Sequence, residues 1–561
     1  MDQFAPVQYK RRDPSLPKGR QVSDGHVAHV ARLIGDLPRR RDMVIEALHI
    51  FQDTQGHMTA ADLTALAELF RMAPVEIFEV ASFYHHFDVV KENETPPPPV
   101  TIRVATGVTE QMFGAFELID ELRAQVDPAQ VRIVEAPCIG QCDGAPAASI
   151  GKRIIRNATV EKLLQATIQD NSYPELPEYE NLEAFRAGGG YGVLAKIISG
   201  EISSDQAIEQ MSAGGLRGLG GAGFPAGKKW GFVRGYAGPR LMTVNGDEGE
   251  PGTFKDRWWL EKHPHRMLEG AQIAAHVVGC ERIYIYMRDE YPHILEILRH
   301  EIEALERADL CPVPFELRRG AGAYICGEES AMIESIEGKR GLPRHRPPYI
   351  AEVGLFGRPT LNHNVETLLW VPQIIEHGSE WFASQGWTDE NKGVRSFSVS
   401  GRVKEPGVKI APAGIPLNRL IEDYCGGMED GHELYAFLPG GASGGIFPAH
   451  MADRMMDFGT WEQEGGFIGS HAVVVLSQHD SARQAVLNTM RFFKHESCGQ
   501  CTPCRSGTEK IVGLLEVREQ NPELFDDLLT VMRDSSICGL GQAAGNCVAH
   551  LMKHFPEEFA S

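Results

Sequence analysis

A glycine-rich stretch at residues 217–227 constrains the fold of this chain more than any other feature. Five of the ten residues from Gly218 to Gly227 are glycine, so the backbone can approach a ligand closely and adopt positive φ. Successive N–H groups in such a turn form an anion site, and Lys229 follows within reach. The spacing G-x-G-x-x-G is typical of dinucleotide-binding units only when a hydrophobic strand precedes it. Residues 204–211 instead predict a polar helix, which argues against an ordinary Rossmann unit; a flexible loop without a ligand is the alternative.

Length and charge restrict the class of protein. A chain of 561 residues with 42% hydrophobic residues should form several globular domains. Its formal net charge of −21 argues against nucleic acids and anionic membranes as partners. No apolar run reaches the length of a transmembrane helix, and the first residues lack the apolar region of a secretory signal. We therefore expect a cytoplasmic protein.

Hydrophobic periodicity predicts an α/β multidomain chain. Strand and helix patterns alternate in its middle, which indicates layers of helices on a sheet. The predicted parts are a helical region at 20–90, a β-α-β-β module with a cysteine loop at 100–170, an α/β domain at 185–395, a β-grasp-like domain at 396–478 and a helical domain at 480–561. Four consecutive prolines separate the first two parts.

A second glycine-rich turn lies at residues 318–330, between a predicted strand and a predicted helix. The N-terminus of a helix favours an anion or a ring carbonyl. Residues 339–346 then contain four basic residues and a histidine. A basic loop is usually only solvated, but in so acidic a chain it is a candidate phosphate site. Together with the acidic loop at 245–252, these loops suit a flavin and a nicotinamide dinucleotide.

Four cysteines predict a metal cluster. Cys498, Cys501 and Cys504 have the spacing C-x₂-C-x₂-C, and Cys538 follows in a glycine-bounded turn. Three thiolates on one loop with a fourth from elsewhere favour a [4Fe–4S] cluster. Zinc is the competing metal, although Cys₄ zinc sites usually consist of two C-x₂-C pairs. Cys547 is the alternative fourth ligand.

Five motifs in order resemble the NADH-binding flavoprotein subunit of respiratory complex I and its soluble relatives. They lie at 217–230, 245–257, 322–329, 364–367 and 497–505, within a resemblance that covers about 185–561. The tract at about 24–170 resembles the thioredoxin-like [2Fe–2S] subunit of the same systems, fused in front. Residues 338–348 and 536–542, with this fusion, are most similar to the β subunit of NAD-dependent molybdenum- or tungsten-containing formate dehydrogenases.

The resemblance implies that residues 185–395 bind FMN and NAD, that 480–561 hold a [4Fe–4S] cluster, and that 100–170 form a thioredoxin-like domain. The residues implied at the FMN are Gly218, Gly220 and Lys229 at the phosphate with Asn364 nearby, Asn245, Asp247 and Glu248 at the ribityl and ring atoms, and Tyr324, Gly327 and Glu328 at the isoalloxazine. Those implied at the NAD are Phe224, Phe232 and Tyr349 around the adenine, and Glu250 and Glu329 on hydroxyl or amide groups. Arg346 stands where relatives often have lysine. No residue is assigned acid–base catalysis, because the cofactors carry the chemistry.

The thioredoxin-like region departs from this family at its cluster ligands. The family uses four thiolates, and Cys138 and Cys142 supply the second pair. The places of the first pair fall at Ala105 and Glu110. We therefore expect this domain to be cluster-free and structural; a cluster completed by other ligands or by a partner chain is the alternative.

The resemblance implies an NAD-linked diaphorase subunit of a formate dehydrogenase. It would exchange hydride between NAD(H) and FMN, and single electrons with the [4Fe–4S] cluster. Its partner would be a catalytic molybdenum- or tungsten-containing subunit that carries iron–sulfur clusters. The alternatives are the diaphorase of an NAD-reducing hydrogenase or of complex I, and a non-catalytic assembly protein with a zinc site.

Overall fold

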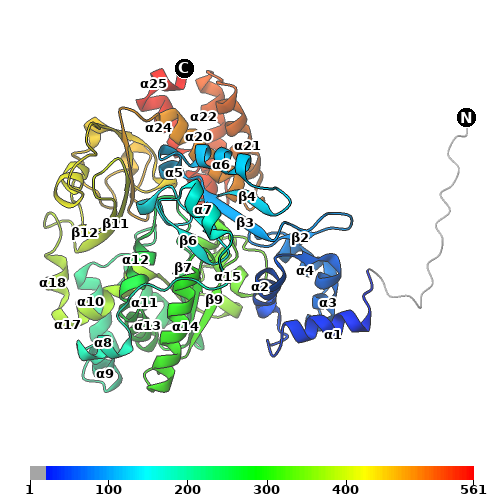
Figure 1. Cartoon of the computed structure of the whole chain (residues 1–561). Coiled ribbons are helices and arrows are strands. Elements are labelled where there is room, and N and C mark those ends of the chain that lie inside the picture. The colour runs from blue at the N-terminus through cyan, green and yellow to red at the C-terminus, as the bar shows by residue number, and fades with distance from the viewer. Residues whose placement is uncertain (1–19, 561) are drawn as a thin grey trace, which may run out of the picture. The chain divides into compact units, whose positions relative to one another are not determined.

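The structure is a computed structural model that describes residues 20–560 (Figure 1). The chain divides after Pro96 into two compact units. The described part of the first unit contains α1 (Asp24–Leu33), α2 (Val44–Gln55), α3 (Ala60–Phe70) and α4 (Pro74–Ala81), with the short parallel strands β1 (Met58–Thr59) and β2 (Val89–Val90). Helix α3 begins at a capping box, in which Thr59 and Asp62 satisfy each other's backbone N–H groups. The predicted helical region is confirmed.

The second unit begins with a thioredoxin-like module. Its elements are β3 (Val100–Ala105), α5 (Val108–Met112), α6 (Ala115–Gln125), β4 (Val131–Ala136), β5 (Ala148–Ile150), β6 (Arg153–Ile155) and α7 (Val160–Ala166). The sheet order is β4-β3-β5-β6, with β3 and β4 parallel and the other pairs antiparallel. This is the predicted β-α-β-β arrangement, and the cysteine loop follows β4.

A parallel sheet of order β10-β7-β8-β9 forms the centre of the next domain. Its strands are β7 (Arg240–Gly246), β8 (Cys280–Met287), β9 (Phe315–Arg319) and β10 (Thr360–Asn364). The helices are α8 (Leu182–Ala187), α9 (Gly192–Ile198), α10 (Ser204–Gly214), α11 (Ala226–Gly235), α12 (Lys255–Lys262), α13 (Pro264–Val278), α14 (Pro292–Arg307), α15 (Glu329–Ile336), α16 (Val365–Leu369), α17 (Val371–His377) and α18 (Ser379–Ala383).

Strand β10 is the edge strand that sequence reasoning did not predict. Its residues Asn362 and His363 are polar yet buried. Thr243 donates a hydrogen bond to the Asn362 side chain (3.0 Å), and the Trp230 indole donates to His363 Nε2 (2.7 Å). Since their partners come from β7 and α11, which are distant in sequence, the local pattern does not reveal a strand.

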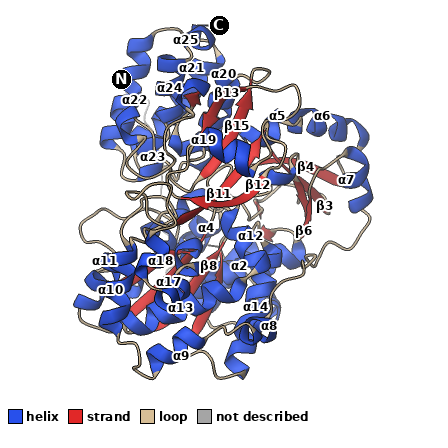
Figure 2. Cartoon of the chain, turned by 90° about the vertical axis from the view of Figure 1, so that its left-hand side faces the viewer, coloured by secondary structure: helices blue, strands red, loops and turns tan. Residues whose placement is uncertain are grey.

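A mixed sheet of order β12-β11-β15-β13-β14 follows, as predicted for a β-grasp-like domain. Its strands are β11 (Val394–Gly401), β12 (Gly407–Pro412), β13 (Leu434–Leu438), β14 (Phe447–Pro448) and β15 (Ala472–Ser477), with α19 (Leu417–Arg419) and a π-helical turn at Leu420–Tyr424. The central pair β11 and β15 is parallel. Strands β13 and β14 were not predicted. Figure 2 shows this sheet and the parallel sheet as separate layers.

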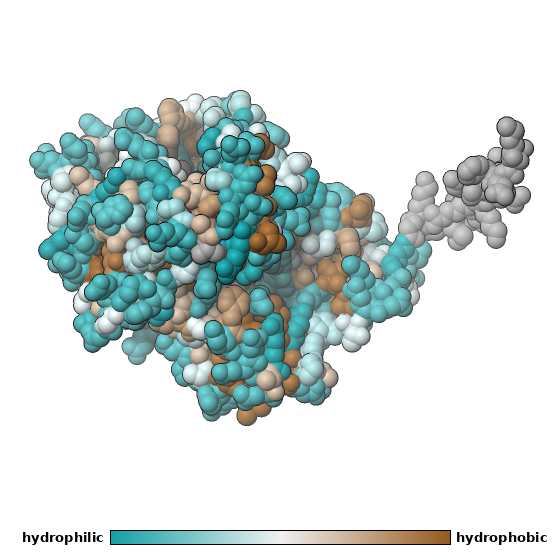
Figure 3. Space-filling model, turned by 90° about the horizontal axis from the view of Figure 1, so that it is seen from above, coloured by the Kyte–Doolittle hydropathy of each residue, from teal (hydrophilic) through white to brown (hydrophobic). Residues whose placement is uncertain are grey.

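The C-terminal part is helical, as predicted. It contains α20 (Ala482–Glu496), α21 (Thr502–Glu516), α22 (Pro522–Ser535), α23 (Gly539–Ala543), α24 (Asn546–His554) and α25 (Pro556–Ala560). Among residues 20–560, no helix combines the length and apolar composition needed to cross a membrane. The face in Figure 3 is mostly hydrophilic, with its hydrophobic side chains in small separate groups.

A buried ion network joins the parallel-sheet domain to the β-grasp-like domain. Lys255 Nζ lies 2.7 Å from Asp256 Oδ1 and 3.2 Å from Glu366 Oε2, and all three side chains are at most 2% exposed. Glu366 Oε1 accepts a hydrogen bond from the backbone N–H of Ser396 on β11 (2.8 Å). Removing one member of such a network leaves an uncompensated buried charge.

We expect the substitution Glu366→Ala to destabilise the protein by about 3–5 kcal/mol, because Lys255 loses a partner and the Ser396 N–H loses its acceptor. The measurement is the thermal unfolding midpoint at a fixed flavin concentration. The control is Glu516→Ala, which breaks an exposed pair with Arg491 and should change stability by about 0.5 kcal/mol or less. Equal midpoints for the two variants would contradict this account.

Candidate functional site

The first glycine loop connects α10 to α11 without a preceding strand, as predicted. Gly218 N–H donates to Phe224 O (2.8 Å), which closes the loop. Leu219 N–H donates to Thr367 Oγ1 (2.9 Å). A Cβ atom on Gly220 would lie 2.8 Å from Asn364 Cβ, so a larger residue would push the loop off α16. The loop is therefore held in place from both sides.

Lys229 is the cation of this loop. It lies on the first turns of α11, and its Nζ donates to the Asn362 carbonyl of β10 (3.1 Å). An ammonium group has three N–H donors, so one bond to a carbonyl leaves capacity for a phosphate. Burial lowers the Lys229 pKa, which a bound anion would oppose. Its neighbour Lys228 is exposed.

The second glycine loop meets the first acidic loop. Asn245 Nδ2, at the end of β7, donates to Gly327 O (2.8 Å). A Cβ on Gly327 would lie 3.2 Å from Asp247 O. Asp247 Oδ2 is buried and lacks a hydrogen-bond partner among residues 20–560, and burial raises the Asp247 pKa well above its usual value. An orphaned polar atom between two close loops fits a ligand hydroxyl, as in a flavin ribityl chain.

The carboxylate of Glu248 is occupied within the protein. It accepts hydrogen bonds from the backbone N–H groups of Asp256 (2.8 Å) and Arg257 (3.1 Å) and from the Tyr291 hydroxyl (3.0 Å). Burial raises its pKa to about 7. The structure therefore places this side chain at the start of α12, as a cap. The implied contact of Glu248 with the ribityl and ring atoms of FMN stays a prediction.

Glu250 connects Tyr324 to a third glycine-rich loop. It accepts hydrogen bonds from the Tyr324 hydroxyl and from Ser443, through both N–H (2.7 Å) and Oγ (3.0 Å). Tyr324 N–H donates to the Glu496 carboxylate (2.9 Å), at the end of α20. Sequence reasoning missed Ser443 and Glu496. The four glycines among residues 440–445 were the available signal for Ser443, and for Glu496 it was the position two residues before Cys498.

The basic loop is largely neutralised by carboxylates of the same domain. Arg346 pairs with Glu328 and Glu329. Lys339 and Arg344 each pair with both Glu334 and Glu337. At least three of its four cations therefore have internal partners, and the role of this loop at a phosphate stays a prediction.

The three aromatic residues implied around an adenine are exposed. Phe224 is 43%, Phe232 59% and Tyr349 58% exposed. The rings of Phe224 and Phe232 lie 6.3 Å apart between centroids. Exposed large aromatic rings beside the loops can accept a stacked base, and their role remains a prediction.

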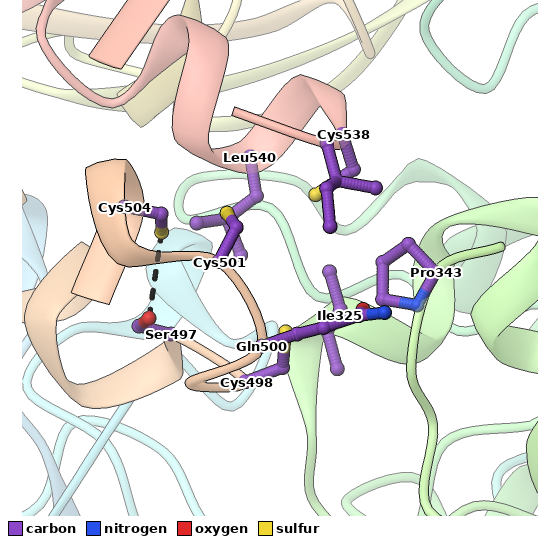
Figure 4. Close-up of a pocket in the computed structure, with 10 residues that line it drawn as sticks. Ile325, Pro343, Ser497, Cys498, Gln500, Cys501, Cys504, Cys538 and Leu540 are labelled. Carbon is purple, nitrogen blue, oxygen red and sulfur yellow. Dashed lines mark hydrogen bonds between the residues drawn. The ribbon is translucent and has the colours of Figure 1, made fainter. Parts of the chain in front are cut away.

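The structure brings Cys498, Cys501, Cys504 and Cys538 together around one cavity (Figure 4). Cys501 and Cys538 precede the first residues of α21 and α23, and Cys504 lies in the first turn of α21. Ile325, Pro343, Ile537 and Leu540 complete the apolar lining. Burial raises the pKa of Cys504 to about 11 and of Cys538 to about 12, so thiolates here need a cation. This donor set fits a [4Fe–4S] cluster.

Cys547, the alternative ligand, lies elsewhere. Its thiol is buried on α24 and donates to the Ala442 carbonyl (3.2 Å). It does not line the cavity of the other four cysteines. The geometry therefore favours Cys538 as the fourth ligand.

The cysteine loop of the thioredoxin-like module does not fit a [2Fe–2S] cluster. Cys138 and Cys142 lie with Glu110 of α5, and the ligand atoms of these three residues are within 4.8 Å of one another. The remaining position, at the end of β3, is Ala105, which has no ligand atom. Three donors, one of them a carboxylate, do not replace four thiolates.

Three family profiles match the chain. Residues 211–373 match the Nuo51 FMN-binding domain, residues 484–561 the NADH-ubiquinone oxidoreductase-F iron–sulfur binding region, and residues 30–170 the thioredoxin-like [2Fe–2S] ferredoxin. These matches confirm an FMN-binding domain, an iron–sulfur region and a thioredoxin-like domain. The formate dehydrogenase assignment has no counterpart among them.

Curated relatives match most of the chain. It is 40% identical over 403 residues to a subunit of the NADH-quinone oxidoreductase of Rhizobium meliloti (strain 1021), across 69% of this chain and 95% of the relative. It is 36% identical over 455 residues to the mitochondrial NADH-ubiquinone oxidoreductase 51 kDa subunit of Neurospora crassa, across 74% of this chain and 92% of the relative.

A solved structure is similar to this chain over nearly its whole length. A chain of the NAD⁺-reducing [NiFe]-hydrogenase in the H₂-reduced state has a TM-score of 0.82 and 33% identity, over 93% of both chains. From the profiles, the relatives and the loops that converge on one site, the chain belongs to the family of the NADH-binding 51 kDa flavoprotein subunit of complex I.

Proposed function

We propose that this chain is the NAD-linked diaphorase subunit of a multi-subunit oxidoreductase. The observation that carries the proposal is the short connection between the flavin loops and the cysteine cavity. Tyr324 donates its N–H to Glu496, and its neighbour Ile325 lines the cavity of Cys498. A nucleotide site and an iron–sulfur site that share one loop suit transfer between a two-electron donor and a one-electron acceptor.

The residues of the chain bind and orient the cofactors. Bound FMN supplies hydride exchange with a nicotinamide and single-electron exchange with a cluster. Gly220 and Lys229 would hold the phosphate, and Asp247 would accept from a ribityl hydroxyl. The ring would lie near Tyr324, whose hydroxyl Glu250 fixes. The cysteines at 498, 501, 504 and 538 would hold the [4Fe–4S] cluster.

Two catalytic partners that differ in their metal are candidates, beside the complex I-type dehydrogenase that the curated relatives support. The likeness to the hydrogenase chain extends over 93% of both chains, including the fused front part, and supports a hydrogenase-type complex. The formate dehydrogenase resemblance rests on residues 338–348 and 536–542. Pro343 from the first segment and Ile537 and Cys538 from the second line the same cavity. The two segments that carry the formate dehydrogenase resemblance therefore both contribute residues to the proposed cluster site. Electrons would be exchanged with a partner at this site.

Purification of the complex through a tag on this chain distinguishes the partners by their metals. A hydrogenase subunit brings nickel and supports NAD⁺ reduction by hydrogen, whereas a formate dehydrogenase subunit brings molybdenum or tungsten and supports reduction by formate. We expect flavin, iron and NADH–dye reductase activity with either partner. Purified chain with zinc but no flavin would instead support the assembly protein.

We expect Lys229→Ala to weaken FMN binding about 10- to 100-fold, because a charge-assisted hydrogen bond contributes about 1.5–3 kcal/mol. The measurement is a fluorescence titration of deflavinated protein with FMN. Lys228→Ala is the matched control, since it removes an exposed lysine one position earlier. Similar affinities for the two variants would exclude Lys229 from the phosphate site.

We expect Cys538→Ser to lose the [4Fe–4S] cluster, because only three thiolates remain around the cavity. The loss of the cluster is measured by the iron and sulfide content and by the low-temperature EPR spectrum of the reduced protein. The control is Cys547→Ser, which keeps a donor for the Ala442 carbonyl and should retain the cluster. Loss of the cluster in the control with retention in Cys538→Ser would reverse the ligand assignment.

A further inference from the structure

The thioredoxin-like module contains a buried group of three metal-binding side chains. Cys138 and Cys142 are 2% and 3% exposed, and Glu110 is fully buried. The two Sγ atoms are 3.2 Å apart, and the Glu110 carboxylate lies within 4.8 Å of both. Glu110 takes the place of a thiolate of the related domains and still faces the site.

Both carboxylate oxygens of Glu110 are buried and lack a well-formed hydrogen bond among the described residues. The neighbouring side chain within reach is the Cys142 thiol, a weak donor. Burial raises the Glu110 pKa. A buried carboxyl group without strong donors is destabilising unless something else satisfies it. Two unpaired oxygens beside two thiols form a four-atom donor set.

The backbone leaves room for this carboxylate. A Cβ on Gly107 would lie 2.7 Å from Glu110 Oε2 and 3.5 Å from Cys138 Cβ. Glycine at this position, at the start of α5, therefore permits Glu110 to reach the cysteines. Phe254 is fully buried and packs with Cys138 and Cys142 in one small cluster.

Two buried arginines hold the cysteine loop through hydrogen bonds to its carbonyl groups. Arg288 Nη2 donates to the Cys138 carbonyl (2.9 Å), and Arg257 Nε donates to the Gly140 carbonyl (2.8 Å). Asp143 is already paired with Arg257 and Arg156, both at 2.8 Å, so it is not a further ligand. The loop is thus fixed by hydrogen bonds, while the charges of the two arginines are balanced by Asp143, Glu261 and Glu290.

We propose that Glu110, Cys138 and Cys142 bind one zinc-class divalent cation, in the place where related domains have a [2Fe–2S] cluster. Thiolates and carboxylates are zinc ligands, and two thiolates with a bidentate carboxylate would supply the four donor atoms of a tetrahedral site. Two thiolates and one carboxylate carry three negative charges, which Zn²⁺ reduces to one. A disulfide between the thiols would leave the Glu110 oxygens unsatisfied, so we favour the metal.

The test is metal analysis of the full chain, purified anaerobically with its flavin and [4Fe–4S] cluster. We expect about one zinc per chain. X-ray absorption at the zinc edge should show two sulfur and two oxygen neighbours, which distinguishes this site from zinc bound by the four C-terminal cysteines. Glu110→Gln, close in size to the natural residue, and Cys142→Ser should each lower the zinc content at least tenfold. Flavin and the iron of the [4Fe–4S] cluster should not change.

Cys425→Ser is the control, because Cys425 is a buried free thiol in the β-grasp-like core. It should retain full zinc. Three results would overturn the proposal: no zinc in the natural protein, iron beyond that of the [4Fe–4S] cluster that disappears in Glu110→Gln, or a mass lower by two hydrogens that marks a Cys138–Cys142 disulfide. Should Glu110→Gln fail to fold, cobalt(II) added to metal-depleted natural protein gives a second measurement. The absence of thiolate-to-cobalt absorption with two-sulfur coordination would equally refute the site.

Discussion

The run of charged residues that begins α12 is the constraint on which the second unit depends. Lys255, Asp256 and Arg257 are at most 2% exposed. Lys255 and Asp256 share one group of partners, and Arg257 has another. Lys255 pairs with Glu366, which also binds β11, while Asp256 Oδ2 accepts from Asn364 Nδ2 (2.6 Å). Arg257 binds the cysteine loop of the thioredoxin-like module. Since buried unpaired charge is strongly destabilising, α12 is stable only when all three domains surround it.

This arrangement explains why the ligand loops are held so firmly. Glu248 caps α12 from the acidic loop, and Asn364 contacts α12 on one side and Gly220 on the other. The loops at the proposed flavin site are thus tied to the same buried helix. Sites supported by packed neighbours keep their geometry better than sites on free loops. The orphaned Asp247 oxygen is the exception within this framework, and that is where a ligand hydroxyl would be satisfied.

The sequence predicted the elements with strong local signals. The charged amphipathic helix at α14, the apolar strand β8 and the C-x₂-C-x₂-C loop all have patterns set by near neighbours. Sequence reasoning missed structure that depends on contacts with residues distant in the sequence. Strand β10 is polar because Trp230 and Thr243 satisfy its side chains. The ion pairs of the basic loop were not predicted, because its carboxylate partners, Glu328 and Glu334 among them, lie outside the loop. The hydrogen bonds of the Glu248 carboxylate at the start of α12 likewise come from residues that the local sequence pattern does not reveal.

The difference between the two cysteine sites bears on where electrons can go. The C-terminal cavity keeps four thiolates and lies beside Ile325 of the flavin loop. The thioredoxin-like site has a carboxylate at Glu110 beside its two thiols and no ligand atom at Ala105, and two arginines hold its loop. Zinc has no accessible redox change, so with zinc at Glu110 this module would not accept electrons. The contribution of this module would be structural. The bound zinc would fix the loop that Arg257 and Arg288 bind, and the fixed loop would complete the burial of α12. Electron exchange with a partner would then depend on the cluster held by Cys498, Cys501, Cys504 and Cys538.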